Sequence, residues 1–451
     1  MDSPVIVKNA VFEAEIEGYT AEGAGVCRIG GVAVFVPGTI SGERCRVRIV
    51  KALKTYAFGR LEEILAPSPH RVTPDCPHFP VCGGCDFRHM DYAEELRLKA
   101  LRVHDALCRI GGFSLEIPEI VPAPETDGYR NKAQFPLREE AGHTVFGFFR
   151  SHSHQLVPLS SCALGRTEAL ALARAVCSWA DENRVETYDE NTHGGLLRHV
   201  YIRSGEGGHH LTVVTAARPA AADTLPTYAR AVCPTLCGVV LNYNPEPGNR
   251  VLGTRCETLW GKGTLSDVLL GNTYRLSPLS FYQVNKVQAE RLYTAAAELS
   301  GLDGTQDALD LYCGVGTITL TLAPRCRKIV GVEIIPDAVR DAQDNAARNG
   351  IKNVRFLCGD AGNAARALAE DGFMPEVIVC DPPRKGLDES CLSAIATLSP
   401  KRIVYVSCDC ASLARDARLL RERGWKLETV RAFDLFPRTA NVETVVLLSQ
   451  L

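Results

Sequence analysis

The sequence predicts a multidomain protein with an N-terminal OB-like β-barrel, a central α+β domain with a metal cluster, and a C-terminal α/β Rossmann-like domain. Three observations lead to this prediction. Short strand-like runs bounded by glycine turns fill residues 1–62. A group of cysteines stands in the proline-rich segment after them. Strand-like and helical stretches then alternate through residues 276–451, as in a doubly wound parallel sheet.

The composition is that of a globular protein, with 46% hydrophobic and 23% charged residues among 451 and a formal net charge of −3. This charge argues against a wholly basic nucleic-acid-binding surface, although it leaves room for a local basic patch. The chain contains no apolar run of about 18 residues, so we expect no membrane span. The N-terminus lacks the features of a signal peptide, and we expect a cytoplasmic protein whose 18 cysteines are mostly reduced or metal-bound.

The N-terminal barrel should contain five strands. The candidates are Val5–Glu17, Ala24–Ile29, Gly31–Pro37, Arg44–Val50 and Tyr56–Ile64. Arg44, Arg46 and Arg48 alternate with apolar residues, which places three cations on one face of a strand. Lys51, Lys54 and Arg60 extend this stripe, and no acidic residue lies between Arg44 and Arg60. The pattern favours phosphate contacts with RNA over the alternative of a solvated strand face.

Cys76, Cys82 and Cys85 place three thiols within ten residues, and the glycines between the last two allow the backbone to wrap tightly. Such spacing is typical of a site for a soft metal. A fourth ligand must come from elsewhere, and Cys162, which follows a strand-like run, is the best placed candidate. The spacing alone does not separate zinc from an iron–sulfur cluster, since both accept four thiolates.

The central domain is expected to comprise residues 63–92 and 125–275. Its predicted elements are strands at Lys132–Leu137, Thr144–Phe149, His199–Ser204, His210–Ala216 and Thr235–Tyr243, and a helix at Thr167–Glu182. The Tyr129–Lys132 segment is compatible with RNA contacts and equally with a surface turn. A helix at Asp91–Ile110 has an apolar stripe that needs a partner, and Pro118–Glu125 forms a linker. We therefore expect residues 93–124 to pack on the C-terminal domain.

The C-terminal domain begins its alternating pattern with a buried strand at Ala308–Tyr312, a turn containing Gly314 and Gly316, and a helix that starts at Thr317. A strand, a glycine turn and a helix N-terminus in this order predict a nucleotide-cofactor site. The dinucleotide fingerprint requires a third glycine where this chain has Thr319, which weakens the prediction of a pyrophosphate-binding turn.

Acidic residues follow the next strands, with Glu333 at the second, Asp360 at the third and Asp381 at the fourth. A carboxylate at the tip of the second strand can accept both ribose hydroxyls of an adenosine. The amide of Gln283 can both donate and accept hydrogen bonds, which suits a carboxylate or a base edge. Acidic strand ends together with Asp381-Pro382-Pro383 favour S-adenosylmethionine over NAD.

Seven motifs occur in order along nearly the whole chain: CPHFPVCGGC, YRNKAQF, FYQVN, DLYCGVG, DPPRKGL, YVSCDCASLARD and FPRTANVETVVLL. With them the chain resembles the RNA (uracil-5-)-methyltransferases, and more closely the branch that modifies 23S ribosomal RNA. The resemblance implies an OB-type TRAM domain at residues 1–62 and an S-adenosylmethionine-dependent methyltransferase domain at 276–451. Related tRNA enzymes commonly lack the TRAM and cluster segments, so the resemblance favours rRNA. We expect a monomer.

The resemblance also implies roles for individual residues. A [4Fe–4S] cluster would be held by Cys76, Cys82, Cys85 and Cys162. The implied cofactor positions are Gln283, Tyr312, Glu333 and Asp381, with Thr317 and Asp360 at further contacts and Gly314 and Gly316 in the glycine turn. Cys408 would be the nucleophile and Glu443 the base. The chain departs from the family at Asn441, where His is usual, and this departure leaves the orientation of Glu443 open.

The implied chemistry agrees with the residue types. A thiolate that adds to C6 of uracil activates C5 toward a methyl donor, and a base must then remove the C5 proton. Cys408 lies at a strand end just before a helix, where a thiolate is favoured. RNA cytosine-5 methyltransferases usually place a cysteine after the motif proline, whereas Pro383 is followed here by Arg384, which favours uracil.

The sequence also allows other roles for these residues and other functions for the chain. Without the resemblance, Cys408 could be a buried thiol at a strand end and Glu443 an exposed strand residue. The chain could also be a tRNA uridine C5-methyltransferase, or a non-catalytic RNA-binding or iron–sulfur sensing protein. The intact Cys408, Glu443 and strand-end acids argue against the last of these.

Overall fold

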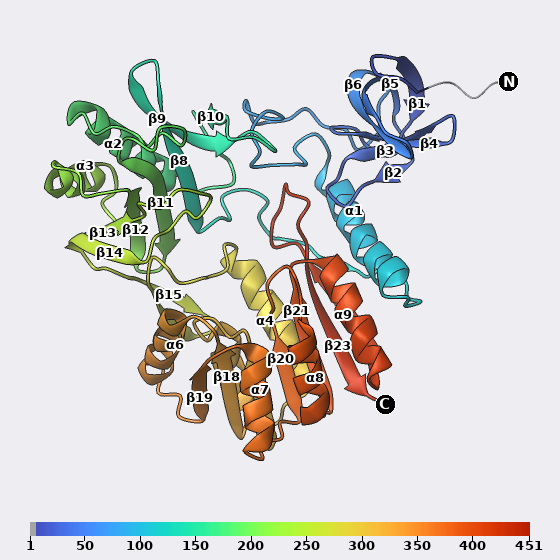
Figure 1. The fold of residues 1–451 in the computed structure, drawn as a ribbon, viewed down its shortest axis with the longest axis vertical. Helices are drawn as coiled ribbons and strands as arrows, with labels where there is room; N and C mark the ends of the chain where they lie inside the picture. The colour runs from blue at the N-terminus through green and yellow to red at the C-terminus, as the bar shows by residue number, and fades with distance from the viewer. Residues whose placement is uncertain (1–5) are drawn as a thin grey trace.

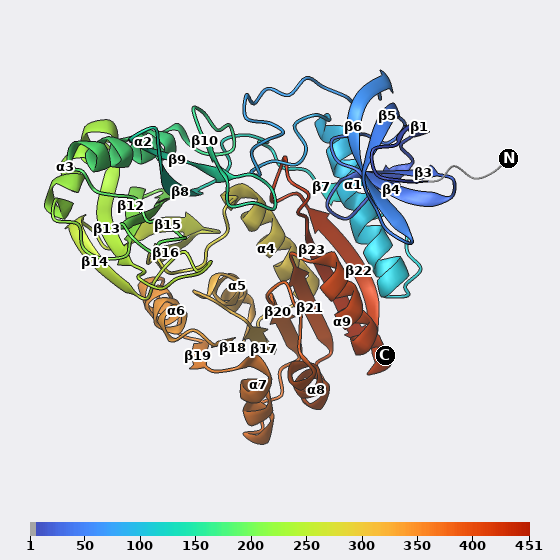
Figure 2. The same ribbon diagram turned by 45° about the horizontal axis from the view of Figure 1, so that its top comes forward.

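The structure is a computed structural model that describes residues 6–451 (Figure 1). An N-terminal barrel and a central domain occupy the two upper corners of the view, and the C-terminal α/β domain lies below them. Turning the molecule keeps this arrangement, with helix α1 lying between the barrel and the C-terminal domain (Figure 2). Among the described residues, no helix combines the length and apolarity that crossing a bilayer requires.

The N-terminal barrel contains one more strand than the sequence predicts. Its strands are β1 (Val11–Glu15), β2 (Gly18–Tyr19), β3 (Gly25–Ile29), β4 (Val32–Val36), β5 (Arg44–Ala52) and β6 (Tyr56–Ala66), in the order β1-β5-β6-β4-β3-β2. The extra strand is β2, which lies just beyond the expected Val5–Glu17 strand, while β1 occupies part of that range; Val5 lies outside the described residues. Alternate residues such as Val34, Cys45 and Val47 are fully buried and form the barrel core.

The arginine stripe of β5 is not acid-free in the folded barrel. Arg46 forms ion pairs with Glu13 of β1 and Glu63 of β6, and Arg48 forms one with Glu62 of β6. These carboxylates reach the stripe from the neighbouring strands, where residues distant in sequence become cross-strand partners. The prediction of an unopposed basic face at Arg46 and Arg48 is therefore wrong.

The central domain is built on a seven-stranded sheet with helices on one face. The order is β10-β9-β8-β11-β12-β13-β14. The strands are β8 (Lys132–Glu140), β9 (His143–Phe149), β10 (Leu156–Pro158), β11 (Leu197–Gly205), β12 (Gly208–Thr215), β13 (Leu236–Tyr243) and β14 (Arg255–Gly261). Helices α2 (Thr167–Glu182) and α3 (Leu225–Val232) pack against it. The sequence predicts α2 and the five inner strands but not α3 or the two edge strands, because short edge elements carry weak periodicity.

The C-terminal domain contains an eight-stranded sheet in the order β19-β18-β17-β20-β21-β23-β22-β7. Its strands are β7 (Ile120–Val121), β17 (Asp307–Leu311), β18 (Lys328–Glu333), β19 (Val354–Cys358), β20 (Val377–Cys380), β21 (Arg402–Ser407), β22 (Trp425–Phe433) and β23 (Glu443–Gln450). Its helices are α4 (Lys286–Ser300), α5 (Thr317–Leu322), α6 (Pro336–Arg348), α7 (Ala361–Glu370), α8 (Glu389–Leu398) and α9 (Cys410–Glu422). Only β23 runs antiparallel to its neighbours in this sheet of the described chain.

Two segments that precede this domain in sequence are built into it. The hairpin of β15 (Leu265–Leu269) and β16 (Asn272–Leu276) contributes its apolar residues to the core of the C-terminal domain. The expected linker Pro118–Glu125 instead contains β7, which pairs in parallel with β22 at the edge of the sheet.

Helix α1 (Tyr92–Asp105) and the π-helical turn that follows it (Ala106–Ile110) cover one face of the C-terminal domain. Val103 and Leu107 are fully buried and form one apolar cluster with Cys410 and Ala414 of α9. Leu98 enters a second cluster that includes Ile40 of the barrel region and Ala440. Helix α1 is thus packed on the C-terminal domain and also contacts the barrel.

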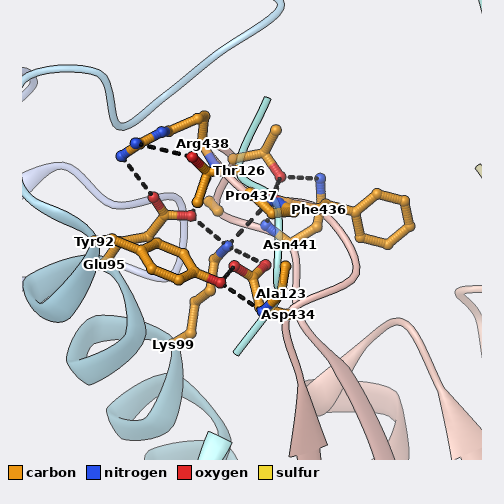
Figure 3. A network of polar contacts seen from close by, with 12 residues as sticks. Tyr92, Glu95, Lys99, Ala123, Thr126, Asp434, Phe436, Pro437, Arg438 and Asn441 are labelled. Atoms are coloured by element: carbon orange, nitrogen blue, oxygen red, sulfur yellow. Dashed lines mark hydrogen bonds and ion pairs between the residues drawn. The ribbon is translucent and has the colours of Figure 1, made fainter. Parts of the chain in front are cut away.

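A buried polar network fixes this packing (Figure 3). The ammonium group of Lys99 donates to Glu95 Oε1 and to Asp434 Oδ1, both at 2.7 Å, and all three side chains are fully buried. The hydroxyl of Tyr92 donates to Asp434 Oδ2 at 2.7 Å, and the backbone N–H of Arg438 donates to Glu95 Oε1 at 2.7 Å. The network therefore joins α1 to the loop between β22 and β23.

We predict that Lys99→Met lowers the free energy of unfolding by about 3–5 kcal/mol, because two carboxylates would then be buried without their cation. Urea denaturation followed by circular dichroism measures this loss. The matched control is Lys426→Met, which removes an exposed lysine paired with Glu428 and should leave the transition unchanged. Equal effects of the two substitutions would contradict the importance of the buried network.

Candidate active site

Polar residues at the ends of four parallel strands meet at one edge of the C-terminal sheet. Tyr312 follows β17, Glu333 ends β18, Asp381 follows β20 and Cys408 follows β21. The order of the strands reverses between β17 and β20. Ligands of open α/β sheets bind outside the carboxyl ends of the strands at such a reversal, so this edge is the candidate active site.

One pocket at this edge gathers five of the eight predicted cofactor residues, namely Gln283, Tyr312, Gly314, Thr317 and Asp381. Phe281, Tyr282, Tyr293, Cys313, Val315 and Ile318 complete its lining. An apolar and aromatic wall with a few converging polar groups is the usual form of a small-molecule site. The aromatic residues other than Tyr312 are absent from the sequence-based prediction, because nothing in their spacing marks them as pocket residues.

The glycine turn after β17 is held against Glu333. One carboxylate oxygen of Glu333 accepts the N–H of Gly314 at 3.1 Å, and the other accepts the N–H of Ile335 at 2.9 Å. Gly316 adopts a φ of +85°, and a Cβ atom there would lie 3.2 Å from the ring of Phe356, so both conformation and space require glycine.

The other three predicted cofactor residues do not line the pocket. Glu333 contacts the pocket through Gly314, and Gly316 begins α5 directly behind it. Asp360 lies at the end of β19, where its carboxylate accepts the N–H of Asn363 at 3.1 Å and caps α7. The pocket provides carboxylate, amide and aromatic groups of the kind that an adenosine and an amino-acid moiety need, which fits S-adenosylmethionine.

The Tyr129–Lys132 segment supports the pocket from the central domain. Asn131 donates its backbone N–H to the carbonyl of Val284 at 2.8 Å and its side-chain amide to the carbonyl of Gln283 at 2.9 Å. Tyr129 donates its hydroxyl to the carbonyl of Pro437 at 3.0 Å. Tyr129 and Asn131 are buried, so they position Gln283 and the loop before β23 and do not form a surface turn.

The predicted nucleophile and base lie side by side because β23 is antiparallel. Ser407 of β21 pairs with Thr444 of β23, which brings Cys408 next to Glu443 at the same edge. Cys408 is half-buried and Glu443 is buried. The N-terminus of α9 is capped by Asp409, whose carboxylate accepts the N–H of Ser412 at 2.8 Å. The carboxylate of Asp409, and not the thiol of Cys408, thus accepts a backbone N–H of the first turn of the helix.

The electrostatics of this pair differ from the sequence-based expectation. Burial, followed by the charges of Glu443 and Asp381, raises the pKa of the Cys408 thiol to about 11. Burial and Asp381 raise the pKa of Glu443 well above its usual range, and burial raises the pKa of Asp381 to about 7. The expected thiolate is therefore not the resting form of the free protein, because the helix end does not offset desolvation and two nearby acids.

Arg384 lies beside this pair, and the sequence-based site prediction omits it. Its positive charge opposes the upward shift in the pKa of both Cys408 and Glu443. One guanidinium nitrogen lies 3.5 Å from the side-chain oxygen of Asn441, the residue that departs from the family pattern. Asn441 thus faces Arg384. The signal available in sequence was a cation placed directly after Asp381-Pro382-Pro383.

The four predicted cluster ligands come together in the central domain. Cys76, Cys82, Cys85 and Cys162 line one cavity, whose wall also contains Phe79, Phe148 and Arg88. All four are free thiols. The N–H of Gly83 donates to the carbonyl of Phe149 at 3.0 Å, and a Cβ atom on Gly83 would lie 2.6 Å from that oxygen. Glycine therefore lets the cysteine loop lie against β9.

The thiols line the walls of this cavity without closing around a single point. Within residues 6–451, no three His, Cys, Asp or Glu side chains are placed to bind one common metal ion. A zinc ion would need its sulfur ligands each at about 2.3 Å from one centre. The donor set itself, four thiols on a partly apolar wall, is one that a zinc ion and an iron–sulfur cluster both accept.

The fold and pocket define the C-terminal domain as a Rossmann-like methyltransferase domain, and comparisons with known proteins identify the family. The family model for tRNA (Uracil-5-)-methyltransferase matches residues 271–451, and the TRAM domain model matches residues 8–61. An uncharacterized RNA methyltransferase of Clostridium tetani is 38% identical over 99% of this chain and 98% of its own length. An uncharacterized RNA methyltransferase of Halalkalibacterium halodurans is 39% identical over 98% of this chain and 97% of its own length.

Among solved structures, the Pyrococcus abyssi tRNA (uracil-54, C5)-methyltransferase in complex with S-adenosyl-L-homocysteine is similar over 97% of this chain and 99% of its own, with a TM-score of 0.78 and 26% identity. The chain belongs to the RNA (uracil-5-)-methyltransferase family. It is an S-adenosylmethionine-dependent RNA methyltransferase with an N-terminal TRAM domain.

We predict that Arg384→Met slows the alkylation of Cys408 by iodoacetamide at mildly alkaline pH. The thiolate reacts, and it becomes abundant only as pH approaches the Cys408 pKa of about 11. Arg384 lowers this pKa, so its removal raises the pKa and reduces the thiolate fraction at a given pH. Peptide mass spectrometry isolates Cys408 from the other cysteines. Arg355→Met, which removes an exposed arginine on β19, is the control and should leave the rate unchanged.

Proposed function

We propose that this protein transfers a methyl group from S-adenosylmethionine to C5 of a uridine in 23S rRNA through a covalent bond between Cys408 and C6. The observation that carries the proposal is the placement of Cys408 and Glu443 side by side at the edge that also holds Asp381 and the pocket. Membership of the family supports the uracil C5 position. A thiol and a buried carboxyl group in contact with one ligand edge supply the two groups that this chemistry needs.

In the first step, the thiol of Cys408 loses its proton to solvent and the sulfur forms a bond to C6, while the C5–C6 π electrons move to C5 and the O4 carbonyl. When bound, S-adenosylmethionine supplies an electrophilic methyl group on a positively charged sulfur. C5 takes this methyl group, and the carbon–sulfur bond of the donor breaks with its electron pair left on the donor sulfur. Glu443 then accepts the C5 proton, the Cys408–C6 bond breaks, and the C5=C6 double bond returns.

The proton inventory of the free protein suits this order of events. Burial and the charges of Glu443 and Asp381 raise the pKa of Cys408 to about 11, and burial and Asp381 raise the pKa of Glu443. Each group acts as nucleophile or base only in its ionised form. Arg384 favours the ionised form of each. A positive charge brought into the pocket beside Asp381 would act in the same direction.

A tRNA uridine is the second candidate substrate. The similar Pyrococcus abyssi enzyme is named as a tRNA methyltransferase, and it matches 97% of this chain. A match of that extent includes most of the TRAM and cysteine segments. These segments therefore do not by themselves distinguish rRNA enzymes from tRNA enzymes, and the preference for 23S rRNA rests on the ordered motifs of the sequence.

The test is methyl transfer from labelled S-adenosylmethionine to purified 23S rRNA and, separately, to bulk tRNA, both from cells that lack the gene. We expect label in 23S rRNA at C5 of uridine, located by nuclease mapping and mass spectrometry. Label in tRNA alone would show that the substrate is tRNA and not 23S rRNA. Label in neither RNA would leave a non-catalytic RNA-binding protein and overturn the proposal.

We predict that Cys408→Ala and Glu443→Gln fail at different steps. Without the thiol, C5 is not activated and no adduct with RNA forms. Glu443→Gln retains the thiol, so addition and methyl transfer proceed, but the C5 proton has no acceptor and the methylated RNA stays bound to Cys408. Denaturing electrophoresis should show a labelled protein–RNA band for Glu443→Gln only.

Cys256→Ala serves as the control for this pair, because Cys256 is an exposed thiol on β14, outside the active-site pocket. It should turn over like the wild type and form no stable band. Normal turnover by Glu443→Gln would assign the base to another group. Methylation by Cys408→Ala would refute the covalent mechanism, and the buried neighbour Cys410 would be examined next.

We also propose that Cys76, Cys82, Cys85 and Cys162 hold a [4Fe–4S] cluster. The proposal is supported by the spacing of the first three thiols and by the single cavity that all four line. The N–H of Gly84, 3.4 Å from the sulfur of Cys82, is placed to donate a hydrogen bond to that ligand. A cluster at this position would tie the 76–85 loop to the loop that follows β10.

We predict that anaerobically purified protein contains about four iron and four sulfide per chain, as this cluster type requires. Cys82→Ser should lose most of this iron, whereas Cys256→Ser should keep it. Metal analysis, sulfide determination and visible absorbance provide the measurements. One zinc per chain without iron would refute the cluster and leave a zinc site in its place.

A further inference from the structure

Three aromatic side chains stand together on the outer surface of the barrel. Phe35 of β4 and Tyr56 and Phe58 of β6 have ring centroids 5.5–5.8 Å apart. The parallel register of β4 and β6 places Phe35 directly beside Phe58. Tyr56 is 36% exposed and Phe58 is 38% exposed, while the alternate residues Val34 and Ala57 fill the core. We call these three rings the aromatic platform.

Cations surround the aromatic platform on the same face. Lys51 of β5 pairs in register with Phe58, Arg60 follows Phe58 by two residues, and Arg28 of β3 lies opposite Ala33 of β4. Lys51 makes no ion pair in the described part of the chain. The partners of Arg28 and Arg60 lie at 3.9 and 3.8 Å, in contrast to the closely paired Arg46 and Arg48. Exposed rings among loosely paired cations are the pattern of single-stranded nucleic-acid binding.

A groove leads from the aromatic platform toward the catalytic edge. It has a volume of about 760 Å³ and runs between the barrel and helix α1, with Phe35 and Arg28 on the barrel side. Arg97, Arg102 and Arg109 line the helix side, and Cys410 and Ala411 at the start of α9 also line it. These last two residues follow Cys408 by two and three positions.

The groove has the charge that a phosphate backbone needs. Arg109 is 78% exposed and pairs with Asp105 at 3.1 Å, and Arg97 is paired with Glu94. Arg102 donates to the uncharged carbonyl of Ala440 and has no carboxylate partner within residues 6–451. A phosphate can replace or add to the exposed partner of Arg109, since surface ion pairs contribute little by themselves.

We infer that the aromatic platform and this groove bind a single-stranded segment of the RNA substrate, with bases stacked on Phe35, Tyr56 and Phe58 and phosphates on the surrounding cations. The identity of the ligand rests on the proposed RNA methylation. We assign no part to the arginine stripe at Arg46 and Arg48, which the sequence singles out. Arg46 has two glutamate partners, and the pair of Arg48 with Glu62 is less exposed than that of Arg109 with Asp105. Bound in this way, the strand extends along α1 to the edge that carries Cys408.

The test compares the double variant Tyr56→Ser/Phe58→Ser with the arginine variant Arg46→Ser, which leaves Glu62, the partner of Arg60, in place. Fluorescence anisotropy with a labelled single-stranded RNA oligonucleotide gives the affinity over a series of salt concentrations. We expect the aromatic variant to bind about 10-fold or more weakly with an unchanged salt slope, because stacking carries no charge. The arginine variant should bind like the wild type. Lys51→Met should lower the salt slope by about 0.7.

Methyl-transfer kinetics with the RNA that the wild type modifies provide a second measurement. The aromatic variant should raise KM for RNA and leave kcat unchanged at saturating RNA, since the platform lies away from the reacting atoms. Circular dichroism checks the fold. If the double variant unfolds, Tyr56→Leu and Lys51→Met, which leave the barrel core intact, take its place.

Wild-type affinity in the aromatic variant, or a greater loss in the arginine variant, would overturn the inference and assign the aromatic platform to a different partner. The binding assay needs no methyl transfer. A protein that binds the oligonucleotide through the platform but methylates no RNA would therefore refute the proposed function and leave the binding surface standing.

Discussion

The ammonium group of Lys99 lies fully buried between Glu95 of α1 and Asp434 at the end of β22. Burying three charged groups is favourable only when each has its partners, so α1 and the loop after β22 must stay in one relative position. The same loop leads to Glu443, and the backbone at Arg438 is bound to Glu95. The position of the proposed base therefore depends on a helix from a distant part of the sequence.

The candidate active site places the acidic groups Asp381 and Glu443 in buried positions near the Cys408 thiol, with Arg384 as a neighbouring cation. Cys408, Asp381 and Glu443 each have a raised pKa, and ionisation of one disfavours ionisation of the others. Arg384 offsets only part of this cost. The arrangement disfavours a negative charge on Cys408 and Glu443 in the free protein, and a positive charge placed beside Asp381 would favour their ionised forms.

Local patterns predict much of this molecule, and long-range pairing accounts for what they miss. Strand-helix alternation places Glu333, Asp381 and Cys408 correctly at strand ends, and α2 has its predicted bounds. The neutralisation of Arg46, the role of Ile120–Val121 as a strand, and the raised pKa of Cys408 all arise from residues far away in sequence. Periodicity within a short window carries no information about such partners.

The distance along the chain between Lys99 and Asp434, 335 residues, has a consequence for folding kinetics. During synthesis, the barrel and α1 leave the ribosome long before α9 and β22 are made. The apolar face around Val103 and Leu107 therefore remains exposed until α9 can pack on it. Non-local contacts of this kind form slowly and leave surfaces open to aggregation. Folding of α1 onto its site should therefore be a late event.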